Sequence, residues 1–394
     1  MREHLRMRLN NLFNDFFESE RSAGLVLIGC TLVSLLLANS PLQQQYLAIW
    51  NYEVGNHHLS HWINDGLMTI FFLLVGLELE REVYIGELST LNKALLPVIA
   101  AMGGMIVPAA FHLFFNFGTP TQSGAGIPMA TDIAFALAAL SLVGKRVPVS
   151  LKVFLTALAV IDDLGAILVI AFFYTDTLQW TNLFIALSAF VVLLIFNRLN
   201  IRNVIPYLVG GVVMWWYMLH SGVHATISGV LLAFAMPFQN GDEKSTSYRL
   251  QKFLHLPVPF IILPLFALAN TSVVLPERWA HHLTDPNSLG IFIGLFIGKP
   301  VGISLFSYAS SAMKLTRLPS GLNWRHIIGT GMLGGIGFTM SIFVTLLAFG
   351  DPVIIDQSKI VITLSSTVAG IAGYLYLSSV TRKQSALPEV DMNT

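Results

Sequence analysis

The sequence predicts an all-α polytopic membrane protein with about twelve transmembrane helices, folded as a single domain over residues 1–394. Of the 394 residues, 54% are hydrophobic and only 11% are charged, whereas soluble domains carry roughly 25% charged residues. The mean hydropathy is +0.68, and the apolar residues form continuous blocks close to the ~20 residues that a helix needs to cross a bilayer. These blocks lack the alternating polarity of a membrane β-barrel.

Polar breaks divide the chain into twelve apolar segments. Their approximate cores are 23–38, 62–79, 95–115, 126–143, 150–173, 181–196, 204–219, 222–237, 254–274, 289–310, 326–349 and 358–380. The stretch 1–22 before them is polar and amphipathic, so no cleavable signal peptide is expected. The long connection after the first segment carries β-branched and aromatic residues around a Gly-Asn step, which predicts a small β-hairpin at about 45–58.

Lysine and arginine indicate the orientation, because they are enriched on the cytoplasmic side of membrane proteins. With twelve segments, 19 of the 22 basic residues fall on one side of the membrane. Both termini, including the tail 381–394, are therefore predicted to be cytoplasmic, and the hairpin extracytoplasmic. The formal net charge is zero, so no nucleic-acid partner is expected. The single cysteine, Cys30, excludes an intrachain disulfide.

Four ionisable residues stand deep within apolar segments: Asp132, Asp162, Asp163 and Lys299. A charge at mid-membrane costs roughly 2.5–3.5 kcal/mol by insertion scales, so such residues are functional candidates by default. Asp162 and Asp163 are consecutive, and their side chains would point about 100° apart on a helix. They are therefore not expected to face the same partner.

The adjacent aspartates suggest exchange chemistry. Burial and mutual repulsion favour the protonated form of a carboxylic acid, and a hard monovalent cation prefers oxygen ligands. A carboxylate in a hydrated pocket then holds either a proton or a cation, and this competition is what an exchanger needs. The alternative is a structural role in which both aspartates pair only with a lysine and backbone groups. Lys299, beside Pro300, either snorkels or pairs with an aspartate, and its depth favours pairing.

Two segments are predicted to be interrupted. Pro128 disfavours helix at Ile127, and Thr131-Asp132 before an apolar run is typical of a helix start. Asp132 is therefore either a helix cap or part of an ion site. Four glycines between Gly331 and Gly337 weaken the helix of the eleventh segment. Paired interrupted helices in a transporter indicate an ion site at mid-membrane.

Other classes of site and protein fit these residues less well. His57, His58 and His61 have no acid or thiol at ligand spacing, so a solvated loop is favoured over a metal site. An intramembrane aspartyl protease would need its aspartates on two helices and a Gly-x-Gly-Asp stretch, which this sequence lacks. A passive cation channel usually places acids in rings around a pore. A transporter that is not an enzyme is the favoured interpretation.

Six motifs in order along the chain resemble the NhaA-type bacterial sodium/proton antiporters: ATDIAFAL, ALAVIDDLGAI, SGVHAT, LPLFALAN, GKPVGIS and GIGFTMSIF. The resemblance runs from the second segment to the last. It implies that two inverted repeats, here about 95–174 and 289–380, form the core, with interrupted helices crossing at mid-membrane. It also implies that Asp162 and Asp163 bind Na+, Li+ and protons, with Lys299 paired to Asp162.

By the same resemblance, Asp132 with Thr131 beside it would neutralise facing helix N-termini, and Lys299 would balance the C-terminal ends. The family's exchange of Na+ or Li+ for H+ is electrogenic and pH-dependent, and needs no cofactor. The implied location is the bacterial inner membrane, and the implied assembly is a homodimer through the hairpin.

The sequence departs from the family pattern at the entry to the ninth segment. Gln251 and Lys252 stand where an acid and a histidine linked to pH response are expected. Four residues remain as candidates for that response: Glu78, Glu82, His224 and His255. The pH set-point is left open by this departure.

Overall fold

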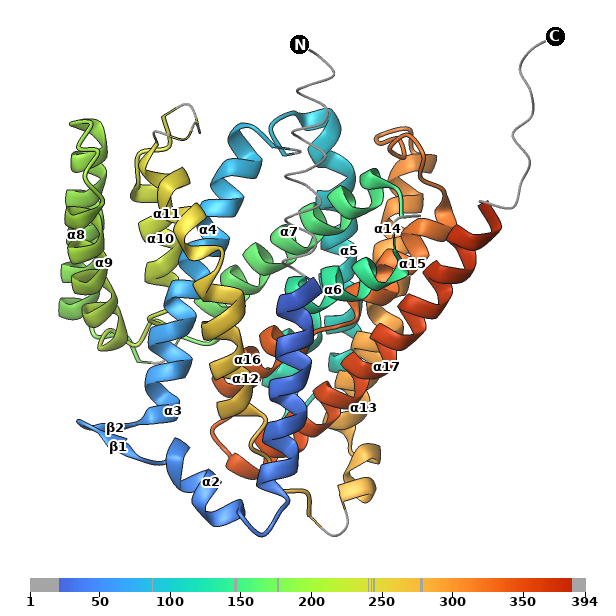
Figure 1. Ribbon diagram of the computed structural model, residues 1–394, viewed down its shortest axis with the longest axis horizontal. Coiled ribbons are helices and arrows are strands. Elements are labelled where there is room, and N and C mark those ends of the chain that lie inside the picture. The colour runs from blue at the N-terminus through green and yellow to red at the C-terminus, as the bar shows by residue number, and fades with distance from the viewer. Residues whose placement is uncertain are drawn as a thin grey trace.

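The computed structural model describes residues 21–384 except 87, 145–146, 176, 240, 242, 244 and 277–278. The described chain is a bundle of helices with one small two-stranded sheet (Figure 1). The predicted all-α membrane fold is confirmed. The stretch 1–20 and most of the tail 381–394 lie outside the described residues.

The elements follow the chain in this order. An unlabelled first helix, Arg21–Ala38, is followed by α2 Gln43–Trp50, β1 Glu53–Val54, β2 His57–His58, α3 Leu59–His61, the π-helix η1 Trp62–Leu67, α4 Met68–Tyr84, α5 Leu91–Asn116, the 3-10 helix η2 Gln122–Met129, α6 Ile133–Val143, α7 Val149–Phe173, α8 Trp180–Arg198, α9 Val204–Leu219, α10 Ile227–Ala235, α11 Thr246–Leu254, the π-helix η3 Val258–Ile262, α12 Leu263–Asn270, the 3-10 helix η4 Trp279–Thr284, α13 Pro286–Ile293, the π-helix η5 Gly294–Gly298, α14 Lys299–Ala312, α15 Trp324–Gly334, α16 Phe338–Ala348 and α17 Pro352–Gln384.

The predicted number of twelve crossings is only partly supported by helix length. Among the described residues, nine helices are long and apolar enough to cross a membrane, and the bent pair α15–α16 makes a tenth candidate. The seventh predicted segment is the shorter apolar helix α9. The eighth is reduced to the nine residues of α10, because turns take up the residues on either side of it.

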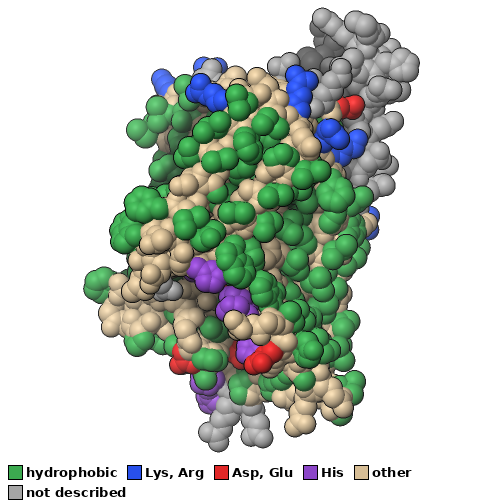
Figure 2. Space-filling view, turned by 90° about the vertical axis from the view of Figure 1, so that its left-hand side faces the viewer, with side chains coloured by type: hydrophobic (Ala, Val, Ile, Leu, Met, Phe, Trp, Pro, Cys, Tyr) green, Lys and Arg blue, Asp and Glu red, His purple; other side chains and the backbone are tan. Residues whose placement is uncertain are grey.

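The surface has the charge distribution that the sequence predicts. On the face shown in Figure 2, most lysine and arginine side chains lie near one end, while histidines and most acidic side chains lie in the other half, and hydrophobic side chains cover much of the surface. This surface fits the interior of a bilayer, where exposed side chains are apolar.

The small hairpin predicted at about 45–58 is present but shorter, because helix α2 takes up Gln43–Trp50 and only residues 53–58 form the hairpin. Glu53 pairs with His58 and Val54 with His57 in an antiparallel ladder. Gly55 takes a φ of +69° in the connecting turn, a left-handed conformation that glycine adopts without steric cost. The strands are exposed, and the hairpin projects from the bundle at the lower left of Figure 1.

Helices α5 and α14 cross at very close range. A side-chain carbon added at Gly103 would overlap the carbonyl oxygen of Gly302, and one added at Gly302 would overlap the carbonyl oxygen of Gly103. Small residues allow this approach of two backbones in a membrane protein. The neighbouring Gly104 lies against the side chain of Lys299, so the crossing determines where that lysine lies.

The helix containing Lys299 continues through Pro300, which lies in the first turn of α14. Residues 286–312 form one span, and the π-helix η5 directly precedes Lys299. The Lys299 N–H donates to the carbonyl of Gly294, five residues earlier. A π segment is a turn with hydrogen bonds between residues five apart inside an α-helix, and such turns are often found at functional sites.

The substitution Gly302→Leu tests the close crossing. We expect it to destabilise the folded protein by about 1–3 kcal/mol, because an overpacked side chain forces the two backbones apart. Thermal unfolding in detergent, followed by intrinsic fluorescence, measures the change. Val301→Leu, at a position 43% exposed on the same helix, is the control; equal melting temperatures for the two variants would contradict the crossing.

Candidate functional site

The two interrupted spans lie against each other. In the first, η2 ends at Met129 and α6 begins at Ile133, with extended backbone between them. In the second, α15 and α16 meet at an angle of 47° across residues 335–337. The Asp132 N–H donates to the carbonyl of Ile336 at 2.7 Å. The two breaks are therefore joined through their backbones.

Asp132 caps both broken helices. One carboxylate oxygen, Oδ1, accepts the Phe135 N–H at 3.1 Å in the first turn of α6. The other, Oδ2, accepts the N–H and the hydroxyl of Thr339, at 3.0 and 2.5 Å, in the first turn of α16. The side chain is only 2% exposed. One negative charge therefore serves two positive helix ends.

Two serines that sequence reasoning missed complete the crossing. Ser366 of α17 accepts the N–H groups of Gly337 and Phe338 at 3.2 and 3.1 Å, so it satisfies the start of α16. Ser341 donates to the carbonyl of Ile127 at 2.7 Å. Gly337 is the N-cap of α16, and a side chain there would overlap the Ser341 hydroxyl. A serine within an apolar helix gives no sequence signal that it faces such a break.

Lys299, Asp162 and Thr131 form one buried cluster. The Lys299 ammonium donates to Asp162 Oδ2 at 2.5 Å and to the Thr131 hydroxyl at 3.0 Å. The Thr131 hydroxyl oxygen lies 2.7 Å from Asp162 Oδ2 and 2.9 Å from the carbonyl oxygen of Gly334. Because the hydroxyl has one proton, it donates to one of these two acceptors at a time. Lys299 and Asp162 are both fully buried. The cluster thus joins α7, α14 and both breaks.

The second aspartate has no such support. Within the described part of the chain, Asp162 Oδ1 and both carboxylate oxygens of Asp163 lack a hydrogen-bond partner, although Asp163 is fully buried. Asp163 lies within the electrostatic reach of Asp162, Asp132 and Glu78, and of Lys299. Buried polar groups are normally hydrogen-bonded, so three unpaired carboxylate oxygens here need an explanation.

The chemistry of this group suits a monovalent cation or a proton. The described residues contain no cluster of three or more His, Cys, Asp or Glu side chains that fits a metal ion. Carboxylate, hydroxyl and carbonyl oxygens are nevertheless close together in Asp162, Thr131 and Gly334. Oxygen donors of this kind are what hard cations prefer.

A cavity approaches the aspartates from the side that carries the lysines and arginines. It has a volume of about 500 Å³. Its lining includes Arg81, Lys93 and Lys152 near the rim and Val160 of α7. Val160 precedes Asp163 by three residues, which is close to one helical turn. The wall of the cavity thus comes within one helical turn of Asp163 along α7, although neither aspartate lines it.

Three of the four candidates for pH response line this cavity. Glu78, Glu82 and His255 contribute to its wall, and His255 Nδ1 lies 3.9 Å from Glu78 Oε1. Gln251 also lines it, whereas Lys252 is exposed on the outside of α11. The structure does not bring the fourth candidate, His224, to this place: its Nε2 lies 2.7 Å from the carbonyl of Tyr174, beyond the far end of α7.

The chain is similar to known proteins along almost its whole length. The family model described as "Na+/H+ antiporter 1" matches residues 14–377. A protein named Na(+)/H(+) antiporter NhaA from Flavobacterium psychrophilum is 64% identical over 374 residues, which are 95% of this chain and 97% of that protein.

Two further relatives have similar names. Na(+)/H(+) antiporter NhaA 1 from Flavobacterium johnsoniae is 60% identical over 94% of this chain and 97% of its own length. Na(+)/H(+) antiporter NhaA from Cytophaga hutchinsonii is 58% identical over 94% of this chain and 96% of its own length. With the resemblance already seen in its motifs, the chain belongs to the Na+/H+ antiporter family of multi-pass membrane transporters, which are not enzymes.

Proposed function

We propose that this protein exports Na+ and Li+ in exchange for H+, electrogenically and in a pH-dependent manner, by alternating access at Asp162 and Asp163. The names of its relatives support Na+/H+ exchange. The main support for the rest is the group of unpaired, fully buried carboxylate oxygens of Asp162 and Asp163, one helical turn along α7 from the cavity wall at Val160. Such groups are costly unless they bind something.

The exchange follows from competition for the same oxygens. A proton or a cation on Asp163 relieves the cost of a bare buried carboxylate, but the two do not bind together comfortably. Asp162 is paired with the Lys299 ammonium. A cation that binds to Asp162 therefore displaces this ammonium group from the carboxylate. Two titrating groups for each cation move net charge inward, which makes the exchange electrogenic. The second proton belongs either to an aspartate or to Lys299.

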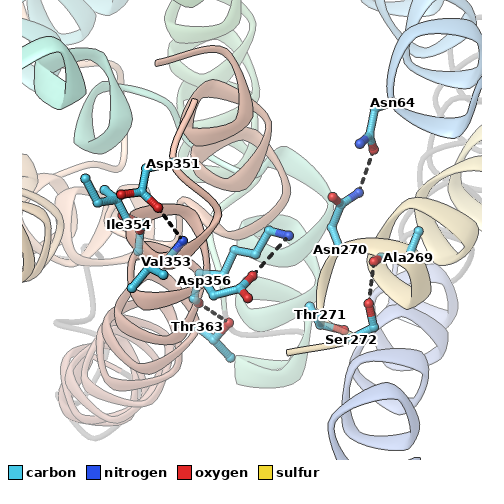
Figure 3. A network of polar contacts seen from close by, with 12 residues as sticks. Asn64, Ala269, Asn270, Thr271, Ser272, Asp351, Val353, Ile354, Asp356 and Thr363 are labelled. Carbon is cyan, nitrogen blue, oxygen red and sulfur yellow. Dashed lines mark hydrogen bonds and ion pairs between the residues drawn. The ribbon is translucent and has the colours of Figure 1, made fainter. Parts of the chain in front are cut away.

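Alternating access requires that only one side be open at a time. The cavity supplies access from the lysine-rich side. Nearer the hairpin, the start of the second span is joined to α12 by the Asn270 side-chain amide, which donates to Asn64 Oδ1 at 2.7 Å (Figure 3). We propose that the predicted repeats, about 95–174 and 289–380, rock against the remaining helices. This movement closes the cavity on the lysine-rich side and opens access from the side of the hairpin.

We also propose a membrane location, an orientation and a dimer for this protein. The protein lies in the bacterial inner membrane, with the lysine-rich rim and both termini in the cytoplasm. The hairpin, about 45–58, is then periplasmic, and its exposed strands provide the surface for a homodimer. No cofactor takes part; Na+, Li+ and H+ are the substrates, and the bilayer is the surrounding partner.

Asp163→Asn tests the central assignment. We expect exchange to fall to background, because the amide neither releases a proton nor neutralises a bound cation. The measurement is dequenching of a pH-sensitive dye in everted vesicles after addition of Na+, Li+ or K+, at neutral and alkaline pH. Asp285→Asn, at a half-exposed position before α13, is the matched control. Normal Na+-dependent exchange in Asp163→Asn would remove the assignment.

Glu78→Gln tests the response to pH. Removal of a negative charge near the buried aspartates favours their ionised form, so Na+ exchange should begin at a lower pH. The pH at half-maximal exchange measures the shift, with a maximal rate close to wild type. Glu53→Gln in the exposed hairpin is the control. An onset that is unchanged, or that moves to higher pH, argues against a role for Glu78.

A further inference from the structure

A second cavity lies away from the ion site, on the membrane-facing side of the broken helices. Its volume is about 440 Å³. Its walls come from the first helix Arg21–Ala38, α6, the start of α16 with the break before it, and α17. We refer to it as the lateral groove. None of its lining residues belongs to the lining of the ion cavity.

The first helix forms one wall of the groove, and contacts with α6 and α12 fix its position. Near its start, Gly24 packs so closely on Ala138 of α6 that a side chain there would overlap it. Farther along, Ser34 donates to the carbonyl of Leu268 at 2.8 Å and fixes the helix to α12. Another face of the helix lines the groove through four residues at spacings of three and four: Leu25, Ile28, Leu32 and Leu35.

The chemistry of the lining selects a hydrocarbon. The hydroxyls of Thr31, Thr363 and Thr367 donate to carbonyls of their own helices at 2.7–2.8 Å. The Ser366 hydroxyl oxygen accepts the two N–H groups at the start of α16. The other lining residues are almost all apolar. A sugar or polar peptide would lose its hydrogen bonds to water here without replacing them.

The position of the groove points to a membrane lipid. Leu32 and Ile371 on its rim are 55% and 56% exposed, within helices that have the length and composition of membrane spans. Acyl chains therefore surround its opening. Arg21 lines the end of the groove at the start of the first helix, which is the end of that helix farther from the hairpin (Figure 1). An arginine at this level attracts the phosphate of an anionic lipid.

We propose that the lateral groove binds one acyl chain of an anionic phospholipid, whose phosphate pairs with Arg21. The chain packs against Ile336 and Phe338, which flank the interruption between α15 and α16. The bound lipid thus lies directly behind the break whose other side holds the ion site.

The first test fills the groove. Purified protein is stripped of lipid, and binding of phosphatidylglycerol at low lipid-to-protein ratio is measured by native mass spectrometry. Ala139→Phe places an aromatic ring inside the groove, and we expect about tenfold weaker binding, because several buried methylene groups lose their place. Val192→Phe on α8, at a position 46% exposed, is the matched control and should bind as wild type. Equal affinity in Ala139→Phe and Val192→Phe overturns the proposal.

The second test concerns the headgroup. Wild type should bind phosphatidylglycerol about fivefold more tightly than phosphatidylcholine, and Arg21→Gln should abolish this preference. Arg198→Gln, at another exposed arginine at the end of α8, should keep it. A preference that survives in Arg21→Gln overturns the assignment of the phosphate to Arg21. Because binding is measured without transport, the outcome is independent of the proposed ion exchange.

Discussion

Two helices that stop inside an apolar interior create the constraint on which this structure depends. Each break leaves backbone N–H and C=O groups that find no water, and each such group costs several kcal/mol if it stays unsatisfied. Here the breaks satisfy each other: the Asp132 N–H meets the carbonyl of Ile336, and the Asp132 carboxylate caps both α6 and α16. Ser366 supplies the acceptor for the remaining N–H groups. The relative position of the two breaks is therefore fixed.

The ion pair is a consequence of that crossing. Thr131 precedes Asp132 in the same extended segment, so its hydroxyl is held between Gly334 and Asp162 and can accept the Lys299 ammonium. Removing one partner of a buried ion pair typically costs 3–5 kcal/mol, which explains why these groups are all supported. The exceptions are Asp162 Oδ1 and both carboxylate oxygens of Asp163, which lack a hydrogen-bond partner. Carboxylate oxygens left unsatisfied beside a hydrogen-bonded network are typical of a functional site.

The sequence predicted those site residues and helix breaks where a residue type is rare in an apolar helix. Asp132, Asp162, Asp163 and Lys299 were visible because charges are rare in apolar helices, and the breaks were visible through Pro128 and the glycines. Ser366 and Ser341 were not visible, since serines in such helices usually bond to their own backbone, as Ser365 does here. The shortness of α10 was also missed, because an apolar stretch looks the same whether turns shorten its helix or not.

Helix α6 connects the ion site to the lateral groove. It has only eleven residues, yet Ile133 and Leu137 on one face line the ion cavity, while Phe135, Ala138 and Ala139 line the groove. A single helix thus separates an aqueous cavity from a place where hydrocarbon packs. If α6 moves when access alternates, the shape of the groove changes with it, and a lipid bound there has different contacts in the two states. A ligand with different contacts in two states shifts the equilibrium between them, and α6 is the element through which the proposed lipid would act on the ion site.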